Sequence, residues 1–488
     1  MLSRRAVEVA ILAVALSTLI SPFRRDLFVG DETKYAQVIR EMRATGSVFL
    51  PTLGGQPFTH KPPIHFWLID LLTFPLGVYS MGAFVLPSIA AFALLLWLLW
   101  RRGGPLAAFV CATSLMMWAS AQTARMDVSF TLLIAAGLLL LERFFDRDDF
   151  RALLGCAAAL GVATLIKGPM APVIGLVLFF LEWWRRRRAP RGNYLPAIAA
   201  LVLIPLAWFI PAMLLGGNAY THEVIVKQTV GRAVATWVHQ APPWFYLLHL
   251  PATLFPWFFL ALFAVIARPR SFLVNWIIAV ILPYSLMASK LDVYMMAMIP
   301  AVALLTANFV ECGGHAAARI RTANAITAGL LVLAIAALFT KLPYPELKPL
   351  CIVTAIAGAI ALLIILRAAP VTGTIAAGIA ALLPLLYVAI VLMPLVNDLA
   401  STRPLVAALA RQHVPGDQIA LYWCPYLWTR DMPGDLERVV YADRAEDIQG
   451  RVVATSRAHA KDIAPVLARY GHVDQVQMIG KWFDVHRR

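Results

Sequence analysis

The sequence predicts an α-helical membrane protein with about thirteen transmembrane helices and a small C-terminal α/β domain outside the membrane. Three observations support this fold class. Of the 488 residues, 60% are apolar and only 14% are charged, a balance that soluble globular domains do not show. Apolar runs long enough to cross a bilayer recur along the chain and are separated by short charged loops. From Asn397 onward the composition becomes polar and mixed in charge.

The apolar segments are placed in chain order. The first, Ala6 to Pro22, resembles a secretory signal in its flanking arginines, but no small-residue cleavage site follows it, so we interpret it as the first transmembrane helix. The segments lie near residues 6–22, 82–100, 105–122, 127–143, 152–166, 169–184, 193–215, 243–266, 272–289, 292–311, 322–341, 347–366 and 371–392.

A further segment, Ile64 to Val78, decides the topology. It is short, carries Asp70 and is interrupted by Pro75, so it is expected to lie along the membrane interface. With the N-terminus in the cytoplasm, every arginine-rich short loop after the first helix then falls on the cytoplasmic side, as the positive-inside rule requires. The long loop 23–81 and the tail 397–488 fall on the opposite, outer side of the membrane.

The net charge of +15 has two interpretations. Cationic loops retained in the cytoplasm orient the protein, and cations also attract anionic lipids or phosphorylated substrates. The first outer loop is basic and so violates the charge rule, which favours anion binding there. We expect membrane lipids as partners and no nucleic acid. The five cysteines form no CxxC pair, which argues against a disulfide framework or a zinc ribbon.

The tail, 397–488, is predicted to be a separate soluble domain, and residues 1–396 the transmembrane domain. Strand-like stretches cover 418–423, 438–441, 451–455 and 475–479, and a helical pattern covers 458–470. No internal repeat or nucleotide-binding glycine loop is evident in the chain.

The first outer loop carries the strongest chemical signal. Asp31, Glu32 and Lys34 precede Tyr35 at the start of an amphipathic stretch, and acids beside a cation at the membrane surface suit general-base work or phosphate and metal handling. The alternative is that Asp31 caps this helix while Glu32 and Lys34 are merely solvated.

The same loop returns to the membrane through His60-Lys61-Pro62-Pro63. Lys61 either extends to the head groups, as lysines at this depth usually do, or pairs with a lipid phosphate as a compact positive charge. The two prolines restrict the backbone beside it.

The patterns DETKYA, REM and GxxFLPTLGGQPFTHKPP between residues 31 and 63 resemble a known family. They are similar to the first outer loop of the bacterial lipid A 4-amino-4-deoxy-L-arabinose transferases and their protein-mannosyltransferase-like relatives. These are integral-membrane glycosyltransferases of the GT-C type. The likeness is specific across residues 31–67 and looser elsewhere.

The resemblance implies roles for residues of this loop. Asp31 matches the acid proposed as catalytic, Lys61 matches the lysine that holds the carrier phosphate, and Lys34 stands where arginine is usual. Glu32 and Tyr35 are expected to contact substrate. His60 replaces the usual glutamate, which helps to form a metal site in the family. A histidine can ligate zinc, so a divalent metal (zinc or magnesium) at His60 is an expectation and not a certain cofactor.

Later segments resemble further family motifs. Asp127 in an R-x-D context resembles the second conserved acid, with an N-cap as the alternative. Lys167 before Gly168-Pro169 resembles a substrate-contacting lysine, or it only marks a turn.

Two outer loops complete the candidate set. In 216–242, the resemblance points to Arg232 and His239 near the carrier phosphate, although scattered histidines are common in polar loops. Lys290 and Tyr294 are expected to contact phosphate or sugar, or else to extend to the head groups and join the aromatic belt. The topology places all the outer cations at one face: Lys34, Lys61, Lys167, Arg232 and Lys290.

Together these observations predict a glycosyltransferase that moves a sugar from a polyprenyl (undecaprenyl) phosphate carrier to an acceptor at the periplasmic face, with inversion. Cations would neutralise the leaving phosphate and Asp31 would act on the acceptor. Lipid A or another lipopolysaccharide component is the expected acceptor, and a protein or cell-wall glycan is the alternative. A transporter or flippase of lipid-linked sugar is the rival class, but it would place ionisable residues at mid-membrane.

Overall fold

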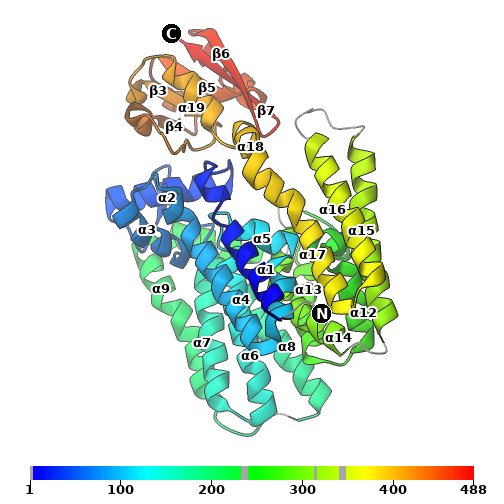
Figure 1. The fold of residues 1–488 in the computed structure, drawn as a ribbon. Helices are drawn as coiled ribbons and strands as arrows, with labels where there is room; N and C mark the ends of the chain where they lie inside the picture. The colour runs from blue at the N-terminus through cyan, green and yellow to red at the C-terminus, as the bar shows by residue number, and fades with distance from the viewer. Residues whose placement is uncertain (1–3, 189, 232–239, 313–315, 340–347) are drawn as a thin grey trace. The chain divides into compact units, whose positions relative to one another are not determined.

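A computed structural model describes residues 4–188, 190–231, 240–312, 316–339 and 348–488 (Figure 1). The chain forms two compact units. The first comprises residues 1–19, 59–65 and 87–388, and the second comprises 20–58, 66–86 and 389–488. Each unit therefore combines segments that are far apart in the sequence.

The first unit is helical. Helix α4 begins in the second unit and continues into the first. Its α-helices are α1 (Arg4–Ser17), α4 (Met81–Ala112), α5 (Leu115–Ala121), α6 (Asp127–Arg147), α7 (Phe150–Lys167), α8 (Met170–Arg186), α9 (Leu195–His222), α11 (Phe245–Thr253), α12 (Phe258–Ala267), α13 (Phe272–Leu286), α14 (Ile299–Glu311), α15 (Ala317–Phe339), α16 (Lys348–Arg367) and α17 (Pro370–Tyr387). The π-helix η2 (Glu223–Gly231) continues α9, and the 3-10 helix η3 (Asp292–Met298) leads into α14.

Every predicted apolar segment contains a helix, and the protein is a multi-pass membrane protein. Among the described residues, seven helices are long and apolar enough to cross a membrane, or eight when α11 and α12 are counted as one span. The helices α6 and α7 pack together, as do α15, α16 and α17 (Figure 1). A hydrogen bond of 2.8 Å from Trp118 Nε1 to Ser17 Oγ joins α5 to α1. The total of thirteen spans stays a prediction.

Two expected spans differ from simple helices. The segment 243–266 is not one straight span, because α11 and α12 meet at 114°. Pro256 lies in the break, where a residue without a backbone N–H cannot continue a helix. In α4, Gly103 and Gly104 leave helical geometry, which separates the predicted segments 82–100 and 105–122 by a kink.

The second unit contains the first loop and the tail. The loop supplies the 3-10 helix η1 (Ser21–Phe23), α2 (Asp31–Thr45), the short strands β1 (Thr52–Leu53) and β2 (Gln56–Pro57), and α3 (Ile64–Leu76). After α17 the chain forms the π-helix η5 (Val388–Leu392), α18 (Met393–Ala400) and α19 (Arg403–Ala410), and α18 leads into the tail. As expected, the segment that begins at Ile64 is a short apolar helix with Pro75 inside it.

A five-stranded mixed sheet organises the tail. Its strands are β3 (Ile419–Tyr422), β4 (Val440–Ala442), β5 (Val452–Ser456), β6 (Gly471–Met478) and β7 (Lys481–Arg487), in the spatial order β4-β3-β5-β7-β6. Strands β3, β4 and β5 are parallel, and β7 pairs antiparallel with β5 and β6. The predicted strands overlap β3, β4, β5 and the end of β6, whereas β7 was not predicted.

One predicted element of the tail is corrected. The helical pattern at 458–470 folds as the 3-10 helix η9 (Arg457–Ile463) followed by the single turn α20 (Ala464–Leu467). Pro465, which lacks a backbone N–H, interrupts any continuous α-helix across this stretch. Three short 3-10 helices fill the other loops of the tail: η6 (Gly416–Gln418), η7 (Gly434–Arg438) and η8 (Ala445–Asp447).

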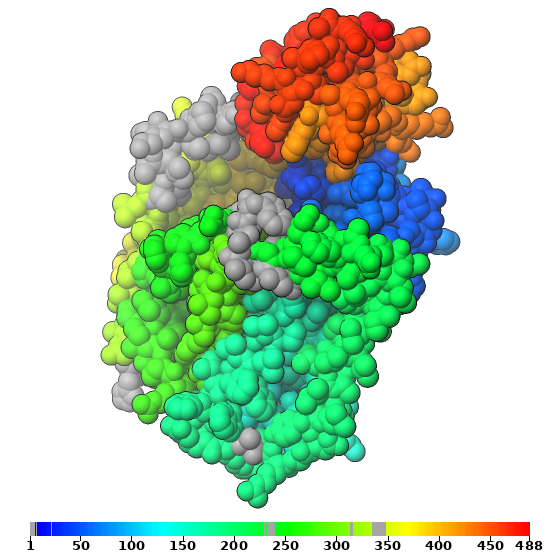
Figure 2. Space-filling model, turned by 180° about the vertical axis from the view of Figure 1, so that it is seen from behind, coloured from blue at the N-terminus to red at the C-terminus, as the bar shows by residue number. Residues whose placement is uncertain are grey.

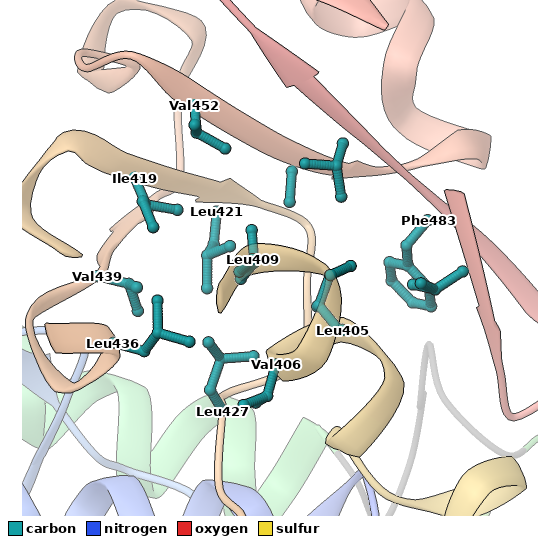
Figure 3. Packing of buried hydrophobic residues seen from close by; sticks show 14 of the residues in the cluster. Leu405, Val406, Leu409, Ile419, Leu421, Leu427, Leu436, Val439, Val452 and Phe483 are labelled. Carbon is teal, nitrogen blue, oxygen red and sulfur yellow. The ribbon is translucent and has the colours of Figure 1, made fainter. Parts of the chain in front are cut away.

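Apolar side chains between α19 and the sheet form the core of the tail. Leu405 and Leu409 of α19 point toward Ile419 and Leu421 of β3, and Phe483 of β7 closes one side (Figure 3). The tail residues, orange to red, gather in a compact body (Figure 2). Burial of these side chains supplies the driving force for this part of the fold.

Candidate functional site

A buried ion-pair cluster joins the ends of two helices in the first unit. Asp127 is the first residue of α6 and Lys167 is the last residue of α7, and their side chains form a salt bridge. Arg125 donates from Nε to the second carboxylate oxygen at 2.9 Å. The Asp127 and Lys167 side chains are only 3% and 8% exposed. Two cations and the positive end of α6 therefore hold one carboxylate at a fixed place.

The N-cap interpretation of Asp127 is wrong. Met126 occupies the N-cap position of α6, and no side chain caps the helix there. Lys167 also does more than mark a turn, since its ammonium lies 4.8 Å from the ring centroid of Tyr294 and 5.5 Å from that of Phe130. A cation above two aromatic faces is stabilised by their electron-rich surfaces. The structure thus brings together three predicted residues: Asp127, Lys167 and Tyr294.

Lys61 and His65 extend this cluster. The half-buried Lys61 adds positive potential at Asp127. His65, four residues later, is fully buried, and its Nε2 lies 3.4 Å from the carbonyl oxygen of Ala124. Burial lowers the pKa of His65 to about 4, against the opposing effects of that carbonyl and of Asp127. The imidazole is therefore neutral at pH 7. Sequence reasoning missed this residue.

Aromatic residues line the next part of the site. Tyr294 stacks on the buried Tyr284 with ring centroids 4.9 Å apart. The hydroxyl of the buried Tyr246 accepts a hydrogen bond of 3.3 Å from the backbone N–H of Leu291. These rings form an amphipathic wall, apolar on their faces and polar at their hydroxyl groups.

A carboxylate–imidazole pair, also absent from the sequence prediction, follows the aromatic wall. Asp292 Oδ1 lies 2.7 Å from His249 Nδ1, and both side chains are partly exposed. Phe245 stacks on the imidazole with ring centroids 3.8 Å apart. The two residues come from η3 and α11, so no sequence spacing connects them.

Lys290 forms hydrogen bonds with the protein backbone. Its buried ammonium donates 2.9 Å to the carbonyl oxygen of Ala241 and also donates to that of Met287. Burial lowers the pKa of the Lys290 ammonium. Two of its three donors therefore join the loop before α11 to the end of α13, which limits what it offers to a phosphate.

The remaining candidates of the first unit are His60, Arg232 and His239. Arg232 and His239 lie outside the described residues. His60 acts electrostatically on Glu223, which pairs with Lys227 at 2.7 Å. Across the described ranges, no three His, Cys, Asp or Glu side chains converge as a metal site requires. The divalent metal expected at His60 stays a prediction.

In the second unit, Asp31 begins helix α2. Gly30, with φ 119°, occupies the N-cap, and no side chain makes a capping hydrogen bond. Asp31 is exposed at the positive end of the helix, and Lys34 is exposed one turn later. The alternative that Asp31 caps this helix is therefore wrong, and Asp31 is an exposed residue.

Glu32 and Tyr35 of α2 are buried. Arg25 donates from Nη1 and Nη2 to the two oxygens of Glu32 at 2.7 and 2.8 Å, and Phe28 N–H adds a third bond of 2.8 Å. Tyr35 packs edge-to-face on Phe66 with centroids 5.2 Å apart. These contacts place both residues in the core of the second unit, whereas the sequence interpretation assigned them to substrate.

A second buried network fastens the first loop to the tail. Asp26 accepts from Arg403 Nε and Nη2 at 2.9 and 2.8 Å and from the Arg430 backbone N–H at 3.1 Å. Asn397 accepts from the Asp26 N–H at 2.9 Å and donates to the Arg24 carbonyl at 3.0 Å. The Arg430 guanidinium reaches the carbonyls of Pro22, Phe23 and Arg25. We refer to this network as the Asp26 clamp.

Comparisons with known proteins agree with this architecture. Residues 60–210 match a family model described as dolichyl-phosphate-mannose-protein mannosyltransferase. The chain is 26% identical over 343 residues to an undecaprenyl phosphate-alpha-4-amino-4-deoxy-L-arabinose arabinosyl transferase of Serratia proteamaculans, covering 65% of this chain and 61% of that protein. It is 28% identical over 375 residues to the protein of the same description in Pseudomonas aeruginosa, covering 69% and 65%. The chain thus spans about three fifths to two thirds of the length of these relatives.

Solved structures identify the fold. ArnT from Cupriavidus metallidurans, in the apo state and bound to undecaprenyl phosphate, matches with a TM-score of 0.75 and 18% identity over 98% of this chain and 97% of that chain. The fold is therefore that of a polytopic GT-C membrane protein. Among such proteins, the resemblance to the aminoarabinose transferases and the mannosyltransferase-like family, predicted from residues 31–67, is confirmed.

Proposed function

We propose that this protein is a bacterial inner-membrane glycosyltransferase that moves a sugar from undecaprenyl phosphate to lipid A or another lipopolysaccharide component. The observation that carries the proposal is the cluster of Lys61, Lys167 and Arg125 around Asp127, with Tyr294 beside it. The relatives named above as arabinosyl transferases, and ArnT with its bound undecaprenyl phosphate, support this donor. The acceptor class is what the family resemblance of residues 31–67 implies.

The donor side needs positive charge. In the transfer, the bond between the anomeric carbon and the phosphate oxygen breaks, and undecaprenyl phosphate leaves with the electron pair. Lys61 is the cation of the cluster that we assign to this phosphate, because it is half-buried. Lys167 is committed to the Asp127 carboxylate and sets the local potential. A fixed array of cations stabilises the charge that develops on the leaving group.

The acceptor side needs an acid or a base. We assign Asp31 to this role, since its carboxylate is exposed, whereas Glu32 is enclosed by Arg25. If the acceptor is a hydroxyl, Asp31 takes its proton as the oxygen attacks from the face opposite the phosphate, which inverts the anomeric carbon. An acceptor phosphate is already ionised and needs only to be positioned.

The proposed topology follows from the charge distribution. The N-terminus is cytoplasmic, and loop 23–81 and tail 397–488 are periplasmic. This arrangement places Lys61, Asp127 and Lys167 at the outer face, which is where a lipid-linked donor meets lipopolysaccharide. Both the donor and the acceptor are amphipathic, so the site is expected at the membrane boundary.

The experiment measures transfer of label from radiolabelled undecaprenyl-phosphate sugars to a panel of acceptors that includes lipid A. Purified wild type is compared with Asp31→Asn and with Asp435→Asn, a matched control at an exposed acid of the tail. We expect transfer with wild type and the control, and its loss with Asp31→Asn. Absence of transfer from every donor, together with movement of the donor across proteoliposome membranes, would refute the proposal and establish a flippase.

A further inference from the structure

The strand order of the tail creates a position where ligands commonly bind. Strand β3 lies between its parallel neighbours β4 and β5. The chain leaves β3 toward β4 on one side and leaves β5 toward β7 and β6 on the other. The connections from the carboxyl ends of β3 and β5 therefore diverge. In open parallel sheets, such a switch point is where the loops make room for a ligand.

An aromatic stack lies at this switch point. Trp423 directly follows β3, and His459 lies in η9, which directly follows β5. The two rings are nearly parallel, with an interplanar angle of 10° and centroids 4.1 Å apart. Nδ1 of His459 lies 3.1 Å from Asp462 Oδ2, which fixes the orientation of the imidazole.

Trp423 is exposed to solvent although His459 packs against one face of its ring. Its relative exposure is 60% even with His459 against one face, so much of the indole faces solvent. Its backbone has φ 52°, in the left-handed region that bulky residues rarely adopt. Backbone strain of this kind concentrates where a side chain must point in a particular direction. An exposed, oriented tryptophan on a rigid sheet is a binding feature more than a packing feature.

The chemistry of the stack suits a sugar ring. A gluco-configured pyranose presents axial C–H bonds on each face, and these pack on the electron-rich face of an indole. Its equatorial hydroxyl groups point sideways, past the edge of the indole, where polar groups and water can bond them. An apolar peptide would need a wider apolar surface, whereas here the surroundings of Trp423 on η9 are polar: Arg457, His459, Lys461 and Asp462.

We propose that Trp423 and His459 form a subsite for a hexosamine pyranose in the head group of the acceptor. The identity of this ligand rests on the proposed function, because the acceptor of that reaction carries glucosamine rings. The subsite holds the acceptor by its sugar and takes no part in bond making or breaking. It would raise the local concentration of acceptor, so its loss affects KM for the acceptor and leaves kcat unchanged.

The test uses the full-length protein in nanodiscs and a soluble probe, the β-linked trisaccharide of N-acetylglucosamine. Saturation-transfer NMR and titration calorimetry compare wild type with Trp423→Leu and Trp423→Phe. Trp184→Leu, a change at a similarly exposed tryptophan of α8, is the matched control. We expect saturation of the axial ring protons in wild type, at least about tenfold weaker binding in Trp423→Leu, and partial retention in Trp423→Phe, because a flat ring remains.

Each outcome bears on the proposal. His459→Ala should weaken probe binding, since it removes the support for the indole. Equal binding by wild type and Trp423→Leu, or no binding by wild type, would overturn the subsite. The probe assay contains no donor, so binding that depends on Trp423 would stand even if the transfer experiment failed. Conversely, normal transfer without probe binding would refute the subsite alone.

Discussion

Replacing Glu32 by glutamine should destabilise the second unit without acting on the chemistry directly. The carboxylate and the Arg25 guanidinium are 5% and 1% exposed and form two parallel hydrogen bonds of 2.7 and 2.8 Å. Glutamine keeps the shape of the side chain but removes its charge. The change therefore leaves a buried guanidinium without its counter-ion.

The size of this destabilisation depends on the burial of the ion pair and on the hydrogen bonds that remain in the variant. Breaking a buried ion pair by changing one partner costs about 3–5 kcal/mol. The lower end applies here, because the glutamine oxygen can still accept one N–H and Arg25 retains its bond of 2.9 Å to the Asp26 carbonyl. A cost of about 3 kcal/mol raises the equilibrium for opening the unit roughly 150-fold.

Cys424 provides a local readout. It lies within the second unit, and its thiol donates to the Ala454 carbonyl at 3.3 Å. Burial raises the pKa of the Cys424 thiol, so the partly buried thiol is expected to react slowly with alkylating reagents while the unit stays folded. The assay follows alkylation of the Cys424 peptide by mass spectrometry in purified protein. Glu446→Gln, which removes one partner of an exposed pair with Arg444, is the matched control and should label at the wild-type rate.

Two further variants complete the test. Arg25→Met should accelerate labelling at least as much as Glu32→Gln, because it leaves a buried carboxylate. The double variant Arg25→Met with Glu32→Leu should recover much of the protection, since neither charge then remains. Unchanged Cys424 labelling in Glu32→Gln, combined with loss of sugar transfer, would refute this reasoning and return Glu32 to substrate binding.

Other predictions concern the first unit. Lys61→Ala should abolish transfer while the thermal midpoint stays unchanged, with Lys481→Ala as the control; near-normal activity of the purified variant would contradict the phosphate assignment. Lys167→Met should lower kcat by about 10² or more, whereas Lys290→Met should lower the thermal midpoint and leave KM for the donor unchanged; the reverse pattern would exchange their roles. His65 has a folded-state pKa of about 4, lowered by burial, so the unfolded state binds more protons as pH falls from 6.5 toward 4, and stability is lost in that window. Between pH 7 and pH 5 this loss is about 2 kcal/mol, and His65→Gln should remove it from the pH dependence of the thermal midpoint; an unaltered pH dependence would show that His65 is not buried neutral.

The membrane helices were predictable because burial in a bilayer demands long apolar runs, and four of the five tail strands because alternating patterns are local; β7 was not predicted. Adjacent acids were harder to distinguish. Asp31 and Glu32 differ by one step around α2, which turns one toward solvent and the other toward Arg25. The two acids differ in that Glu32 pairs with Arg25, seven residues earlier in the sequence. Because a loop lies between Arg25 and α2, their spacing in the sequence does not predict this ion pair.

Other site residues had no sequence signal. His65 lies in an apolar run and was not among the predicted site residues. Its position four residues after Lys61 is the one sequence feature that could have indicated it. Asp292 and His249 come from η3 and α11 and are 43 residues apart in the sequence, so no local pattern relates them. The Asp26 clamp joins residues that no local pattern can relate.

The Asp26 clamp also imposes an order on biosynthesis. Asp26 and Arg403 are 377 residues apart. At about 5–20 residues per second, the ribosome needs roughly 20–75 seconds to deliver the second partner after the first. During that interval the first loop lacks the contacts that bury Asp26. A chain that ends before α19 never forms the contact between Asp26 and Arg403. A truncation in the tail therefore leaves its structural defect in the first loop, hundreds of residues away from the missing segment.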